Sequence, residues 1–137
     1  MSWAGDVARL MSRLLFNSGA LCESFTLATA EHHRWGEIAE YYTEIIGLKY
    51  VPASTEDYLK IQGGRNYFGY QLYYDRLFDR IIDNSKVLGV TGLKQENFMT
   101  LRNGLEKELT ALPRDVVWNP AAEVWDRMDA YLKKQDM

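Results

Sequence analysis

Apolar side chains recur at three- and four-residue spacing in several parts of this chain, which is the pattern of amphipathic helices. The first predicted helix runs from about Asp6 to Asn17, with Asp6 as its cap and Ser18-Gly19 as its end. The second spans about Trp35 to Ile46 and ends at Gly47, a residue suited to the left-handed helix end. Its expected buried stripe consists of Trp35, Ile38, Ala39, Tyr42, Ile45 and Ile46.

Further helices are expected downstream. They are a short helix from Ser54 to about Gln62, a brief helix from Asp83 or Asn84 to about Val90 closed by Gly92, a longer helix capped by Asn97, and a last helix that starts at Asn119-Pro120.

Three other stretches have the alternating pattern of strands. They are Glu23 to Thr29, Leu48 to Ala53 and Leu77 to Asp83. The aromatic-rich stretch from Arg65 to Asp75 does not distinguish a helix from a loop. The order of elements predicts a helix-rich α/β or α+β fold with about three short strands, formed by residues 1–137 as a single domain.

Composition narrows the possible partners and compartments. The chain has 137 residues, of which 47% are apolar, and 16 basic and 19 acidic residues give a net charge of −3. The charges are mixed rather than gathered into a basic stripe, so no nucleic-acid partner is expected. No apolar run is long enough for a membrane span. Cys22 is the only cysteine, which fits a cytoplasmic protein.

Four landmarks along the chain resemble one enzyme family, in the order in which that family carries them. They are WAGDVARLM (3–11), ESFTLATAEHHRWGEIAEYY (23–42), the group Asp83, Ser85 and Lys86, and Gly92 followed by FMTLRNGLEKEL (98–109). Together they cover most of the chain and are similar to the C-terminal part of the NAD-dependent epimerase/dehydratases, the extended short-chain dehydrogenase/reductases.

This resemblance implies the substrate-binding lobe of an NAD(P)-dependent oxidoreductase. Its intact parent would bind NAD(P) and a small-molecule substrate, with the chemistry in a nucleotide-binding half. The glycine-rich loop and the Tyr-x-x-x-Lys pair of the family are absent here. We therefore expect no catalytic residue, no cofactor-binding residue and no cofactor bound by this chain alone. The alternative is a free-standing module, derived from that family, that binds a small molecule or another protein.

Four residues are candidates for substrate contact: Tyr67, Tyr70, Arg76 and Arg80. Tyrosines supply apolar walls and a hydroxyl donor, and guanidinium groups suit phosphate or carboxylate recognition. The alternatives are that the tyrosines pack within the fold and that the arginines form intramolecular ion pairs.

The pair His32-His33 does not predict a metal site, because adjacent residues in a loop point apart and no third histidine or cysteine supports them. If the chain normally docks on a nucleotide-binding half, it should expose an apolar face. We expect such a face to be able to support a homo-oligomer.

Overall fold

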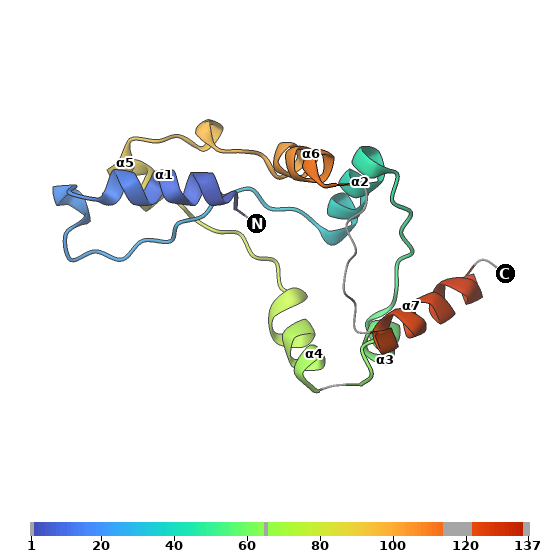
Figure 1. Cartoon of the computed structure of the whole chain (residues 1–137). Helices are drawn as coiled ribbons and strands as arrows, with labels where there is room; N and C mark the ends of the chain where they lie inside the picture. Colours follow the sequence, from blue (N-terminus) through green and yellow to red (C-terminus); the bar gives the residue numbers. More distant parts are fainter. Residues whose placement is uncertain (1, 65, 114–121, 136–137) are drawn as a thin grey trace. The chain divides into compact units, whose positions relative to one another are not determined.

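A computed structural model describes residues 2–64, 66–113 and 122–135 (Figure 1). The regular structure in these ranges is helical. The helices are α1 (Ala4–Leu14), α2 (Trp35–Ile46), α3 (Thr55–Ile61), α4 (Asn66–Gln71), α5 (Ser85–Thr91), α6 (Leu101–Ala111) and α7 (Ala122–Gln135), with short 3-10 turns at Ser18–Ala20 and Gln95–Asn97 and a π-helical segment at Leu72–Arg76.

The chain forms two compact units. Unit 1 combines Met1–Leu48 with Arg80–Leu112, and unit 2 combines Lys49–Asp79 with Pro113–Met137. Each unit is therefore built from two stretches that are distant in the sequence.

The core of unit 1 is small and lies where α1 meets α5. Leu10 of α1 and Val87 of α5 are each only 1% exposed, and Phe98 completes the buried cluster. A ring of half-buried side chains surrounds them: Leu14, Phe25, Leu27, Leu88 and Leu93. A second packing contact in this unit joins α2 to α6.

The first helix starts earlier than predicted, because Trp3 rather than Asp6 is its N-cap. The backbone of Trp3 is extended, and its carbonyl accepts from the N–H groups of Asp6 and Val7. Asp6 lies inside the first turn, where a negative charge complements the helix dipole. The helix also ends earlier, at Leu14.

The predicted bounds of α2 are confirmed, and Gly47 ends the helix with a φ of 70°. At its start the Glu37 carboxylate accepts from the backbone N–H of Arg34 at 2.6 Å. The predicted buried stripe is wrong at both ends, since Trp35 and Ile46 are about half exposed. Its inner members Ile38, Ala39, Tyr42 and Ile45 are partly covered.

The three predicted strands are wrong, and with them the α/β or α+β fold class. Glu23 to Thr29 and Leu48 to Ala53 have no regular structure, and Leu77 to Asp83 begins in the turn after the π-helical segment and continues as irregular chain. A strand requires a second backbone to complete its ladder. No described backbone group pairs with these stretches in a ladder, so the described part of the chain is helical with irregular connections.

Unit 2 is held mainly by α3 and α7. Ser54 caps α3 as predicted, because its Oγ accepts from the Asp57 N–H at 3.1 Å. Arg127 of α7 donates its Nε–H to the carbonyl oxygen of Ile61, at the end of α3. The aromatic-rich stretch that the sequence left undecided is α4, which continues directly into the π-helical segment.

The cap of α6 also differs from the prediction. Thr100 precedes this helix and accepts from the Asn103 N–H, whereas Asn97 lies in a 3-10 turn and accepts from the Lys94 N–H at 2.8 Å. Phe98 is not in the helix, and its ring is buried in the core of unit 1. The predicted start of the last helix, Asn119-Pro120, lies outside the described residues.

Among the residues placed by the structure, no helix has both the length and the apolar composition that crossing a membrane requires.

Candidate functional site

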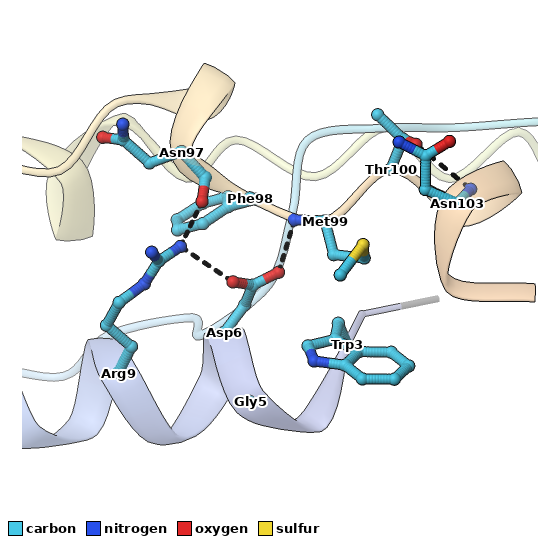
Figure 2. Close-up of a pocket in the computed structure, with 9 residues that line it drawn as sticks. All are labelled: Trp3, Gly5, Asp6, Arg9, Asn97, Phe98, Met99, Thr100 and Asn103. Atoms are coloured by element: carbon cyan, nitrogen blue, oxygen red, sulfur yellow. Dashed lines mark hydrogen bonds and ion pairs between the residues drawn. The ribbon is translucent and has the colours of Figure 1, made fainter. Parts of the chain in front are cut away.

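A pocket in unit 1 lies between the start of α1 and the segment that leads into α6 (Figure 2). Its volume is about 370 Å³, which falls in the range of small-molecule sites. The lining residues are Trp3, Gly5, Asp6 and Arg9 on one side and Asn97, Phe98, Met99, Thr100 and Asn103 on the other.

Asp6 ties the two walls of this pocket together. One carboxylate oxygen accepts from Arg9 Nη2 at 2.8 Å, and the other accepts from the backbone N–H of Met99 at 2.7 Å (Figure 2). Both oxygens are therefore engaged within the protein. The bond to Met99 closes a loop of 93 residues, so this carboxylate fixes the segment before α6 against α1.

Arg9 is held from three directions. Besides Asp6, its Nη2 donates to the carbonyl oxygen of Asn97, and its guanidinium lies 5.7 Å from the centre of the Phe98 ring. Its Nε is buried, and no residue in the described ranges forms a hydrogen bond with it. A guanidinium is a rigid planar donor, so this arrangement orients it toward the pocket wall rather than leaving it to sample solvent.

Trp3 forms the apolar wall. Its ring packs close to Gly104, where an added Cβ would lie 3.4 Å from Trp3 Cε3, and Lys107 Nζ lies 4.8 Å from the ring centre. A smaller apolar hollow continues on this side, between Trp3 and α6. A Cβ at 3.4 Å from Trp3 Cε3 would be in ordinary van der Waals contact, so the Trp3 ring lies against Gly104 without requiring a glycine at this position.

The chemistry available in the pocket is binding rather than catalysis. Both carboxylate oxygens of Asp6 already accept hydrogen bonds from the protein. The Thr100 hydroxyl oxygen accepts from the backbone N–H of Asn103. The remaining groups are an indole face, the edge of a guanidinium and the Asn103 side chain, because the side-chain oxygen of Asn97 accepts from the Lys94 N–H. Among the residues lining this pocket there is no nucleophile with an adjacent base, so we expect it to hold a small polar molecule at most.

A second polar cluster is buried beside the pocket, and sequence reasoning missed it. Asn84, only 5% exposed, donates to the carbonyl oxygen of Ala28 at 3.0 Å and to Gln95 Oε1 at 2.8 Å. Gln95 in turn donates to Thr29 Oγ1 at 2.6 Å and accepts from the Ala30 N–H. The sequence suggested only a helix cap for Asn84, and no pattern marked Gln95.

The two histidines make separate contacts. His33 Nε2 lies 3.0 Å from Glu31 Oε1 without the geometry of a hydrogen bond, and its ring meets Tyr41 edge-on at 5.6 Å. The other oxygen of Glu31 accepts from the Leu101 N–H at 2.7 Å, at the start of α6. His32 instead lies 3.2 Å from the carbonyl oxygen of Ala30.

The structure does not gather the four predicted substrate residues into one described pocket. Tyr67 and Tyr70 lie on α4 with exposed side chains, and Arg76 ends the π-helical segment. Tyr67 accepts from Gln71 Nε2 at 2.6 Å. Arg80 belongs to the other unit. These four assignments remain predictions, and neither of the two hollows in unit 1 includes them.

The landmark residues at Asp83 to Lys86 hold local structure. Asp83 Oδ1 accepts from the Ser85 N–H at 2.9 Å, and this hydrogen bond lowers the pKa of Asp83. Lys86 donates to Glu23 at 2.7 Å and to the Ser24 carbonyl oxygen at 3.0 Å. The hydrogen bond from Lys86 also lowers the pKa of Glu23.

No protein-family model matches this sequence, and neither the curated proteins nor the solved structures contain a significant match to it.

Proposed function

We propose that this chain is the non-catalytic, substrate-side part of an NAD(P)-dependent epimerase/dehydratase-like oxidoreductase. In this proposal it acts with a nucleotide-binding domain that supplies the cofactor site and the catalytic residues. The four landmark segments are the basis of the family assignment.

The observation that carries the proposal is the number of large apolar side chains that unit 1 leaves exposed. Phe16 is fully exposed, and Leu15, Leu21 and Ile81 are each about two-thirds exposed or more. Among the described residues of unit 1, three apolar side chains are buried, so this unit gains little stability from its own core. Exposed apolar side chains beside a core this small fit a segment that another polypeptide covers.

The roles of the landmark residues also support a part without catalysis of its own. Asp6 holds the Met99 backbone, and Asp83 holds the Ser85 backbone. Each is occupied in positioning the chain, which fits a wall of a substrate cleft rather than its reacting groups.

Titration of the chain with NAD⁺ and with NADP⁺ in an isothermal calorimeter tests the first half of this proposal. A cofactor site needs a glycine turn at a helix N-terminus, and this sequence has no such motif, so we expect no heat of binding. Binding of either dinucleotide with a dissociation constant below about 100 μM would contradict the proposal, since that affinity requires a built site.

Sequencing the transcript that carries this coding sequence tests whether the chain acts with a nucleotide-binding domain. A strand, a glycine-rich loop and a Tyr-x-x-x-Lys pair encoded in the same frame or in an adjoining gene would support a two-part oxidoreductase. Translation of this chain without any such neighbour would contradict it.

The second candidate function is a free-standing binding module, and the pocket between α1 and α6 favours it because its walls lie entirely within unit 1. Under this alternative the wild-type chain should bind small carboxylates or amides in ligand-observed NMR. The Arg9→Met variant, which removes the guanidinium and its N–H donors, should lose that binding.

A further inference from the structure

The stretch from Glu23 to Ala30 has the side-chain pattern of a strand without forming one. Phe25 and Leu27 are partly buried against the core of unit 1, whereas Ser24 and Thr26 are exposed. Figure 1 draws it as uncoiled ribbon between α1 and α2. In an extended chain the side chains alternate between two faces, so one face of this stretch covers the core and the other meets solvent.

Side chains near the start of α5 donate to two carbonyl groups on one edge of this stretch. Lys86 donates to the carbonyl oxygen of Ser24 at 3.0 Å, and Asn84 donates to the carbonyl oxygen of Ala28 at 3.0 Å. Backbone groups of every second residue point to the same edge of an extended chain. The edge of Ser24, Thr26 and Ala28 is therefore turned toward α5.

The opposite edge is open at its centre. Thr29 lies on it and donates its N–H to Ser2 Oγ at 3.1 Å. The N–H and carbonyl groups of Phe25 and Leu27 lie on the same edge, and no described residue hydrogen-bonds to them. Two donors and two acceptors thus alternate over three residues, which is the row of groups that a free strand edge offers to another strand.

We propose that this edge pairs with the same edge of a second copy of the chain, antiparallel and around a two-fold axis at Thr26. Phe25 then exchanges both of its backbone hydrogen bonds with Leu27 of the second copy, and Leu27 does so with Phe25. All four open groups of each copy are satisfied, because the row is self-complementary. This inference concerns the chain itself and does not depend on the proposed oxidoreductase role.

The side chains that this register brings opposite each other favour a second copy as the occupant. On the core face, Phe25 of one copy lies opposite Leu27 of the other, so the apolar side chains of the two copies are in contact across the axis. On the solvent face Thr26 meets its own equivalent, a pair that stabilises neighbouring strands. No like charges face each other, since Glu23 falls opposite Thr29 and is already paired with Lys86.

The contact is short, so the dimer is weak. Interfaces well below about 1,200 Å² are characteristic of transient association. Sedimentation velocity between about 1 μM and 1 mM protein covers the dissociation constants expected for such contacts, and a concentration-dependent shift from monomer to dimer is the expected result.

Two variants with the same charge change test the register. Thr26→Lys places two ammonium groups opposite each other at the two-fold axis, whereas Ser24→Lys places each opposite Ala28 and away from its equivalent. We expect Thr26→Lys to raise the dimer dissociation constant about fivefold or more and Ser24→Lys to leave it nearly unchanged. Mixing Thr26→Lys with Thr26→Glu should restore the association.

Hydrogen exchange followed by NMR gives a second readout that a general apolar contact would not produce. In the dimer the amides of Phe25 and Leu27 are protected and the amide of Thr26 between them is not. A monomer at 1 mM with fast exchange at Phe25 and Leu27 would overturn self-pairing and leave the edge to a strand of another protein. A dimer that responds equally to the two lysine variants would overturn it as well.

Discussion

Leu10 and Met11 are neighbours on α1 with opposite environments. Leu10 is 1% exposed and contacts the core of unit 1, whereas Met11 is 55% exposed. Because the cost of truncating a side chain depends on the contacts it loses, the two positions form a matched pair for measuring how much this small core contributes to stability.

We predict that Leu10→Ala lowers the free energy of unfolding by about 2–5 kcal/mol, since it leaves a cavity between α1 and α5. Met11→Ala should change it by about 0.5 kcal/mol or less. Urea unfolding followed by circular dichroism measures both. Equal effects of the two substitutions would show that α1 does not pack through Leu10.

The buried amide of Asn84 allows a second comparison at this scale. Asn84→Ala removes two donors from the carbonyl oxygen of Ala28 and from Gln95, and leaves these groups without that partner. We expect a loss of about 1–3 kcal/mol in the free energy of unfolding. Asn103→Ala, an exposed change of the same type, should cost about 0.5 kcal/mol or less. A similar loss for both would contradict the buried network.

The lowered pKa of Asp83 makes part of the stability depend on pH. A carboxyl whose pKa is lower in the folded state stabilises that state above its unfolded pKa, and this contribution disappears as the pH falls through the folded value. Asp83→Asn retains an acceptor for the Ser85 N–H but removes the charge. We expect its melting temperature to lie below that of the wild type at pH 7 and to converge with it toward about pH 2. Asp79→Asn serves as the exposed control, and an identical pH profile for the two variants would contradict this role of Asp83.

At the scale of elements, local signals predicted helices well and strands poorly. Gly47 and Gly92 end α2 and α5 as expected, because a left-handed helix end depends on the residue that adopts it. A strand depends on a partner backbone, which alternation within one segment cannot reveal. In the stretch from Glu23 to Thr29 the alternation coincides with partial burial of Phe25 and Leu27, although the predicted ladder is absent.

The same distinction explains which parts of the site were predictable. Asp6 and Arg9 stand three residues apart, so their ion pair follows from helix geometry. The bond from Asp6 to the Met99 backbone and the contacts of Gln95 join segments far apart in the sequence. A single sequence contains no local signal for such contacts, and the pocket that they shape was not predicted.

Two glycines of α2 should respond to alanine with opposite signs. Gly47 has a φ of 70°, so Gly47→Ala forces a side chain into the left-handed region and should cost about 1 kcal/mol. An added Cβ at Gly36 meets nothing within 4 Å, and Gly36→Ala should stabilise by about 0.5 kcal/mol through helix propensity. Thermal unfolding of both variants measures the signs, and destabilisation by both would contradict the assigned end of α2.

At the scale of the whole molecule, the two units differ in what holds them. Unit 1 has an apolar cluster reinforced by buried polar contacts, whereas the buried side chains among the described residues of unit 2 are Ile61 and Gln62 at the end of α3. The exposed tyrosines of α4 lie in unit 2.

The contact between Asp6 and Met99 also bears on how the protein is made. Ribosomes release a chain from its N-terminus, and here the partners of α1 are encoded after an intervening stretch that belongs to the other unit. While that stretch is being synthesised, Leu10 has neither Val87 nor Phe98 to contact. During synthesis α1 therefore stays without its core partners until the segment that contains Phe98 has also been made.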